Sequence, residues 1–183
     1  MRSASVLFER LAALIHQSVR DDAARHGLLP IHLQVLAYLA QANRYSDLPI
    51  AVAEYFGITR GTVSQTLSVL ERKGLVARQP DEQHGKRVHL ALTAAGRAVL
   101  AHSWARRLDA ALAQGGPDSA EGTLKALLGA LQRQNGHRAF GVCRQCAHFL
   151  DDGGRHRCGL TGEALSAPQT GKICREWSEP VVG

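Results

Sequence analysis

Residues 58–76, which have the sequence ITRGTVSQTLSVLERKGLV, decide the fold class of this chain. A threonine near the start and a glycine near the end are favourable N-cap and C-terminal residues, so the stretch is expected to hold one helix. Val63, Leu67 and Leu70 are spaced by four and three residues and therefore share one apolar side of that helix. The other side is small and polar, which predicts a helix that packs on a core with one side only.

The elements that flank this helix complete a characteristic order. A shorter helix, expected at about 48–55, stops at Gly57 just before it. Two strands, expected at 75–78 and 87–92, follow it, and apolar residues alternate with other residues in the second strand. A helix, a glycine turn, a second helix and a β-hairpin are typical of a winged helix-turn-helix. The predicted fold is therefore mainly α with a small β-hairpin wing.

Two sets of polar residues on this unit are expected to contact DNA. Small side chains let the second helix enter a major groove, and basic residues at its far end can reach phosphates. The hairpin tip is cationic and suits the minor groove or the adjacent backbone, although a basic turn on its own is often only a solvated turn. The expected contact residues are Thr59, Arg60, Gly61, Thr62, Ser64, Gln65, Ser68, Arg72 and Lys73 on the helix, and Arg78, His84, Lys86 and Arg87 on the hairpin.

Residues 31–100 resemble the MarR family of bacterial winged-helix regulators. ITRGTVSQ at 58–65 and LERKGLV at 70–76 are similar to the family's recognition helix and its exit, and DEQHGKR at 81–87 is similar to its wing. The family's wing commonly carries Asp-Gly-Arg where this chain has His-Gly-Lys, so the acid that braces the inserted arginine is missing. The resemblance implies a homodimeric transcription regulator, expected to be a repressor, that binds double-stranded DNA at an inverted-repeat operator.

Helical periodicity continues on both sides of this unit. Further helices are expected at about 6–25, from Pro30 to about 39, at 94–114 as one long helix, and at 119–134. The first helix and the last two carry apolar stripes beyond what a three-helix head can bury, which fits a dimer interface or a larger monomeric bundle. The expected division is a body at 1–134, with dimerisation helices in 1–27 and 94–134 and a DNA-binding head at 31–93, followed by a cysteine-rich tail at 135–183.

Composition limits the class of protein further. The chain has 183 residues, of which 45% are hydrophobic and 21% are charged, so it has enough apolar residues for a buried core and is not disordered as a whole. No stretch approaches 18 consecutive apolar residues, and charges near the first residues argue against a secretory signal, so we expect a cytoplasmic protein without a membrane partner. The net charge of +6 favours an anionic partner.

All four cysteines lie in the last 41 residues, with the spacing Cys143-x2-Cys146-x11-Cys158-x15-Cys174. Clustered cysteines in a reducing cytoplasm more often bind metal or do redox chemistry than form structural disulfides. A Cys-x-x-Cys pair with two more distant cysteines can close a four-thiolate site, and such a site would fold a segment too small and polar to fold alone. Unligated thiols and a dithiol/disulfide switch remain alternatives.

The identity of the metal is a choice between two centres. One Cys-x-x-Cys pair with two isolated cysteines and aromatic neighbours occurs in iron–sulfur sites. A [4Fe-4S] cluster is favoured because such a cluster can report oxidants, iron or redox status. Zinc is the alternative, since zinc sites of this kind are mostly structural. His148 and His156 are further candidate ligands close to the cysteines.

The sequence therefore predicts a DNA-binding repressor whose cysteine site senses redox or metal status. The alternative is a repressor induced by a small organic ligand, for which His16, His102 and Trp104 are candidate pocket residues, with structural zinc in the tail. An enzyme is not expected, because phosphate-binding glycine loops, Gly-x-Ser-x-Gly elbows and His-Glu-x-x-His stretches are absent from the sequence.

Overall fold

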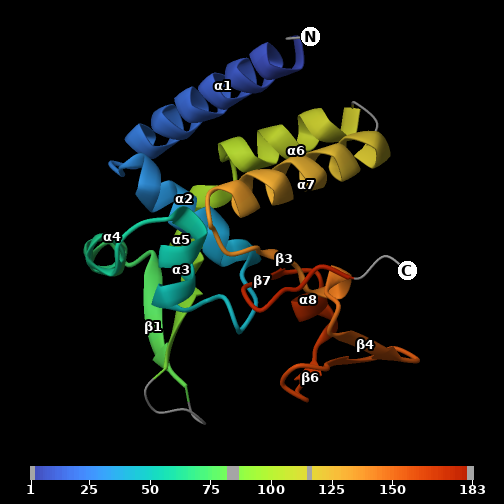
Figure 1. The fold of residues 1–183 in the computed structure, drawn as a ribbon. Helices are drawn as coiled ribbons and strands as arrows, with labels where there is room; N and C mark the ends of the chain where they lie inside the picture. Colours follow the sequence, from blue (N-terminus) through green and yellow to red (C-terminus); the bar gives the residue numbers. More distant parts are fainter. Residues whose placement is uncertain (1–2, 82–86, 115–116, 181–183) are drawn as a thin grey trace.

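The computed structural model describes residues 3–81, 87–114 and 117–180. Helices and one β-hairpin make up the chain as far as Gln134, and short strands follow (Figure 1). The helices are α1 (Ser3–Arg25), α2 (Pro30–Gln41), α3 (Pro49–Phe56), α4 (Arg60–Arg72), α5 (Ala94–Leu100), α6 (Trp104–Gln114), α7 (Pro117–Gln134) and the short α8 (Ala167–Thr170). The strands are β1 (Val76–Pro80), β2 (Val88–Leu92), β3 (Gly141–Val142), β4 (Phe149–Asp152), β5 (Arg155–Cys158), β6 (Ala164–Leu165) and β7 (Ile173–Cys174), with a 3₁₀ turn at Cys143–Gln145.

The main core lies between α2, α3 and α4. Leu33 and Leu36 of α2, Val52 of α3 and Leu70 of α4 are completely buried, and Leu67 is 1% exposed. The three apolar residues that the sequence assigned to one side of α4 therefore all pack inward, since Val63 is also buried. The predicted winged helix-turn-helix is confirmed.

The hairpin β1–β2 is antiparallel, with Val76 opposite Leu92 and Pro80 opposite Val88. It is fixed to the next helix by a close approach at Gly96, where a Cβ would lie 2.2 Å from the carbonyl oxygen of Leu75. Only glycine fits there without a backbone shift. Gly96 therefore lets the start of α5 pack against the chain at the base of β1.

The single long helix expected at 94–114 is wrong, because the chain forms α5 and α6 with a break at residues 101–103. Asp22 of α1 causes the break: its buried carboxylate accepts a hydrogen bond from the backbone N–H of Trp104, at 2.5 Å, and from the guanidinium of Arg107, at 3.1 Å. An acidic group at the first N–H groups of a helix acts as its cap, so α6 begins anew at this point.

The segment after Gln134 forms two small antiparallel sheets, β3–β7 and β4–β5–β6. It lies beside the helix-turn-helix, opposite the α4 side in Figure 1. A parallel bridge between Ala42 and Ile173 joins the end of α2 to β7, so this segment is attached to the head. None of the described helices is both long and apolar enough to cross a bilayer.

Candidate nucleic-acid interface and cysteine cluster

The polar side of α4 is turned to solvent along its whole length. Thr59 caps the helix, because its Oγ1 accepts a hydrogen bond from the backbone N–H of Thr62 at 3.1 Å. Among the described residues, no hydrogen bond holds the side chain of Gln65, which leaves its amide available to a ligand. Every helix residue predicted to contact DNA is exposed, namely Thr59, Arg60, Gly61, Thr62, Ser64, Gln65, Ser68, Arg72 and Lys73.

The two basic residues at the far end of α4 differ in their surroundings. The ammonium group of Lys73 lies over the α1–α2 turn, where it would be 3.7 Å from a Cβ at Gly27. Burial lowers the pKa of His32, and the positive charge of Lys73 lowers it further. Arg72 is exposed without such a partner among the described residues, so Arg72 is the better placed of the two to meet a phosphate.

The wing is tied to α4 at its base. Arg78 lies within β1 rather than at the hairpin tip, and its Nε donates a hydrogen bond to Glu71 of α4 at 2.6 Å. Arg87 is exposed just before β2. His84 and Lys86, which were also predicted to contact DNA, lie outside the described residues. The hydrogen bond between Arg78 and Glu71 thus holds the wing against α4, and both elements carry exposed basic residues.

His89 is a residue of the wing that the sequence analysis did not single out. Its Nδ1 lies 2.5 Å from the carboxylate of Asp47, and its Nε2 lies 3.2 Å from that of Asp81. Burial alone would lower the pKa of His89, but the hydrogen bonds and charges of the two carboxylates raise it above 6.5. Burial raises the pKa of Asp47, and His89 opposes that effect. His89 therefore joins the start of β2 to the loop before α3 and to the end of β1.

The four cysteines are brought together in the C-terminal segment. Cys143, Cys158 and Cys174 are buried in one cluster with Leu165, while Cys146 is half-buried. A hydrogen bond between Cys143 and Cys174 lowers the pKa of Cys174 and raises that of Cys143, and the charges of all three other thiols act on Cys143.

Aromatic side chains and backbone N–H groups surround the cluster. Trp177 packs against it and donates from Nε1 to the carbonyl oxygen of Gln145 at 2.9 Å. A Cβ at Gly141 would lie 2.5 Å from the indole ring of Trp177, so only glycine leaves space for that ring. The backbone N–H of Ser178 donates to Cys146 Sγ at 3.4 Å.

The donor set fits a thiolate-bound metal in its chemistry. Over residues 3–81, 87–114 and 117–180, no three His, Cys, Asp or Glu side chains already stand in an arrangement that holds an ion. Cys143 and Cys174 are instead hydrogen-bonded to each other, and a metal bound by their thiolates would replace that bond. His156 of β5 lies against Phe149, with ring centroids 5.3 Å apart, and near Asp151.

Comparison with known proteins places the head in a family. Residues 26–87 match the model described as MarR family, a span that includes α2, α3, α4 and β1 and ends just before β2. The chain carries a MarR-family domain. This family consists of DNA-binding transcription regulators and not of enzymes, as the sequence led us to expect.

Solved structures share the MarR-family fold at low identity. S. aureus MepR in its DNA-binding conformation is 24% identical, with a TM-score of 0.61, over 73% of this chain and 98% of that one. The S. aureus MepR–DNA complex is 23% identical, with a TM-score of 0.54, over 71% and 96%. CouR from Rhodococcus jostii RHA1, bound to p-coumaroyl-CoA, is 22% identical, with a TM-score of 0.53, over 71% and 90%. The search of curated proteins gave no match.

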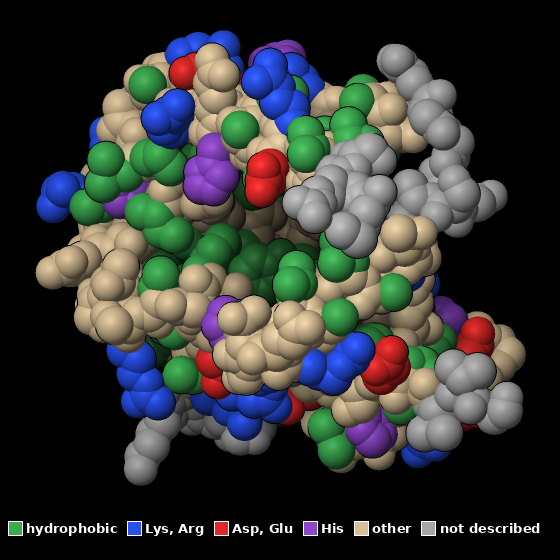
Figure 2. Space-filling model, turned by 45° about the horizontal axis from the view of Figure 1, so that its top comes forward, with side chains coloured by type: hydrophobic (Ala, Val, Ile, Leu, Met, Phe, Trp, Pro, Cys, Tyr) green, Lys and Arg blue, Asp and Glu red, His purple; other side chains and the backbone are tan. Residues whose placement is uncertain are grey.

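The helices outside the MarR-family head leave apolar side chains uncovered. Figure 2 shows such side chains gathered in a hollow of the face that α1, α6 and α7 form in Figure 1. The exposed large apolar residues on these helices are Val6, Leu7, Phe8, Leu11 and Leu14 of α1, Leu112 of α6, and Leu124, Leu127, Leu128 and Leu131 of α7. A single copy of the chain does not cover them.

A cavity of about 720 Å³ lies where the end of α1 meets α5 and α6. Arg25, His102, Arg106 and Arg107 line it together with the buried Asp22. His102 was a predicted pocket residue and is found there. Trp104 packs against the main core, and His16 is exposed on α1.

Proposed function

We propose that the chain is a homodimeric repressor that binds an inverted-repeat operator with α4 in the major groove and the wing beside it. The observation that carries this proposal is the division of α4 into a buried aliphatic side and an exposed side of small, hydrogen-bonding residues. Two copies related by a two-fold axis would place their recognition helices in successive major grooves, about 34 Å apart. We also propose a cytoplasmic location, since the proposed partner is chromosomal DNA.

The exposed leucines of α1 and α7 support the dimer. Single exposed apolar residues need no explanation, but a run of them along two helices of one face is typical of a surface that another protein covers. We assign a second copy of the chain to this face. The face lies on helices that flank the head, so a copy bound there leaves α4 free to contact DNA. Sedimentation of the purified protein tests the dimer directly.

Selection of bound sequences from a pool of random duplexes tests DNA recognition. The expected product is an inverted repeat whose half-sites are one helical turn apart, with affinity that falls as salt rises. Uniform affinity for all duplexes would reject the proposal of sequence-specific binding.

We further propose that Cys143, Cys146, Cys158 and Cys174 bind a metal centre, with [4Fe-4S] favoured over zinc, which senses redox or metal status. The support is the burial of three thiols in one small cluster whose apolar shell is too slight to fold a segment by itself. A cluster of this kind would supply a redox-sensitive centre, and this chain would supply the thiolates, the N–H donor at Ser178 and the exclusion of water by Trp177.

The absorbance spectrum of protein purified without oxygen separates the metals. A broad brown band near ~400 nm is expected for an iron–sulfur centre, whereas a zinc protein is colourless. Cys143→Ser should remove the metal in either case. Wild-type protein that holds neither metal would reject the proposal.

A second candidate function rests on the cavity beside α6. Its arginines would suit an anionic organic ligand, and the CouR structure shows a relative of the same fold with an acyl-CoA bound. In that case the ligand acts as inducer and the tail metal is structural zinc. A metal-free Cys143→Ser protein that still responds to an anionic inducer in a reporter assay would favour this candidate over the metal sensor.

A further inference from the structure

Residues Asn43–Asp47, here called the connector, lie in the loop between α2 and α3. Each of its first four residues is bonded to the C-terminal segment. The backbone N–H of Asn43 donates to the carbonyl oxygen of Ile173 at 3.0 Å, and that of Arg44 donates to the side chain of Gln169 at 3.0 Å. The phenol of Tyr45 bonds to Glu163 and Thr161, and the hydroxyl of Ser46 accepts the backbone N–H of Arg175 at 2.7 Å.

The last residue of the connector is bonded to the wing. The carbonyl oxygen of Asp47 accepts the backbone N–H of Leu90 at 2.7 Å, and its carboxylate pairs with His89. The chain then enters α3 directly at Pro49. The connector therefore has the cysteine-bearing segment on one side and both α3 and the wing on the other.

Asn43 links the connector to the cysteine cluster itself. Its side chain is completely buried, and its Oδ1 accepts from the Tyr45 N–H and the Ser46 hydroxyl, both at 3.0 Å. Its Nδ2 has no hydrogen-bond partner among the described residues, and the backbone N–H of Asn43 is bonded to Ile173, the residue directly before Cys174.

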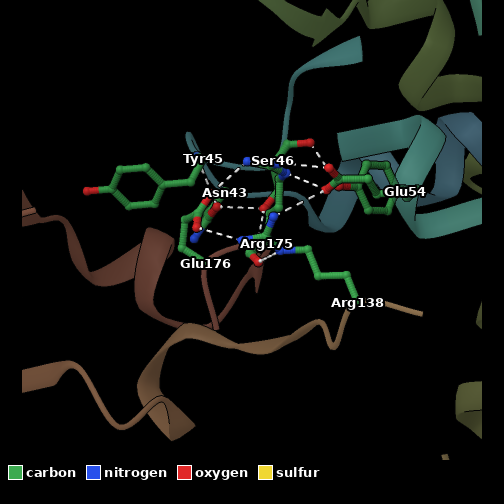
Figure 3. A network of polar contacts seen from close by, with 8 residues as sticks. Asn43, Tyr45, Ser46, Glu54, Arg138, Arg175 and Glu176 are labelled. Carbon is green, nitrogen blue, oxygen red and sulfur yellow. Dashed lines mark hydrogen bonds and ion pairs between the residues drawn. The ribbon is translucent and has the colours of Figure 1, made fainter. Parts of the chain in front are cut away.

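A second contact joins the same region to α3. Arg175, directly after Cys174, forms two hydrogen bonds with the carboxylate of Glu54, at 2.5 and 2.8 Å. Arg138 lies 3.8 Å from the same carboxylate (Figure 3). Both arginines also pair with Glu176 of the C-terminal segment, at 2.7 and 3.0 Å. The hydrogen bonds of Arg175 lower the pKa of Glu54, so this pair is charged in the folded protein.

We propose that the connector and the Arg175–Glu54 pair transmit the state of the cysteine site to α3 and the wing, with Asn43 as the residue that joins the connector to β7, the strand that carries Cys174. This proposal rests on the proposed metal-dependent regulator. Metal binding would fix the sulfur positions and with them β7, the backbone hydrogen bond from Asn43 to Ile173 would pass that change to the connector, and the connector also holds α3 and the wing. The cysteine site and the DNA surface are then coupled without any contact between metal and DNA.

The test measures a coupling factor, which is the ratio of operator affinities of the full-length protein with and without metal. Zn²⁺ alone, and Fe³⁺ with sulfide and excess thiol under anaerobic conditions, are the two probes. Linkage requires that operator DNA change the metal affinity by the same factor, so competition with a chelator, with and without DNA, gives a second readout. Typical coupling factors are about 5–150-fold.

The decisive variants are Asn43→Ala and Glu54→Gln, with Glu176→Gln as the matched control. Glu54→Gln and Glu176→Gln each remove one negative charge from the same two arginines, but only Glu54 belongs to α3. We expect the coupling factor to fall to within about twofold of one in Asn43→Ala and Glu54→Gln and to keep its wild-type value in Glu176→Gln. If Asn43→Ala does not fold, the two glutamate variants decide.

Each other outcome has one meaning. Failure of wild-type protein to hold either probe rejects the proposed metal site, and this inference with it. Metal binding with a wild-type coupling factor of one rejects the inference and leaves a structural metal. A wild-type coupling factor that survives in Glu54→Gln, or that falls equally in Glu176→Gln, rejects the connector as the route.

Discussion

Replacement of Gln65 by alanine is the sharpest test of the recognition surface. Gln65 is exposed on α4, and no hydrogen bond within the described residues holds its side chain. The substitution therefore removes nothing from the fold, and surface changes of this kind alter stability by less than about 0.5 kcal/mol. Any large effect on operator binding must come from a lost contact with DNA.

The magnitude follows from the symmetry of the proposed dimer. One good contact between a side chain and a base edge is worth about 1–3 kcal/mol of discrimination. Because each copy supplies one α4, the loss counts twice, which gives about 2–6 kcal/mol, or roughly a 30-fold to more than 10,000-fold weaker complex. The same substitution should leave affinity for a scrambled duplex nearly unchanged.

Fluorescence anisotropy with the selected operator and with its scrambled version, at two salt concentrations, measures both quantities. Arg72→Ala is the comparison, since a lost phosphate contact weakens binding to both duplexes and makes the salt dependence less steep. If Gln65→Ala weakens both duplexes alike, or neither, then α4 does not read bases at this position and the assignment of its exposed side is wrong.

Three further predictions concern the tail, the wing and the dimer. Gly141→Ala should weaken metal retention in a chelator competition by about 10–100-fold while the head stays folded, whereas Gly171→Ala, which meets open space, should not. The folded-state pKa of His89 lies above the 6.5 of a free imidazole, so its contribution to stability is complete below about pH 6.5 and is lost as pH rises through the raised pKa. Thermal melts at a series of pH values should show this loss in wild type and not in His89→Gln. Leu128→Glu should yield monomers in sedimentation, and Leu160→Glu, equally exposed but in the tail, should not; dimeric Leu128→Glu protein would move the interface elsewhere.

The features that the sequence predicted well are those that depend on neighbours along the chain. The exposed and buried sides of α4 follow from the spacing of its aliphatic residues, and its start follows from the cap at Thr59. Both are local properties, so periodicity and capping preferences were sufficient to find them.

The features that the sequence missed depend on partners far away in the chain. Continuous helical periodicity from 94 to 114 gave no sign of a break, because the group that breaks the helix is Asp22, 82 residues before Trp104. His89 alternates with the apolar residues of its strand, but the carboxylate that holds it belongs to the loop at Asp47, 42 residues away in the chain. A buried acid such as Asp22 is costly unless it is paired, but the sequence alone does not show that it is buried.

The two proposed regulatory sites, which are the cavity beside α6 and the cysteine site, would act on different parts of the head. The cavity at Asp22 lies where α1 meets α6, before the start of α2, whereas the connector begins just after the end of α2. The two regions share no residue, because the cavity is lined by residues of α1, α5 and α6 and of the segment between α5 and α6. Perturbations at separate sites that share no partner usually add rather than couple. A ligand in the cavity and a metal in the tail would therefore shift operator affinity independently, so that the chain could respond to two signals without any contact between their sites.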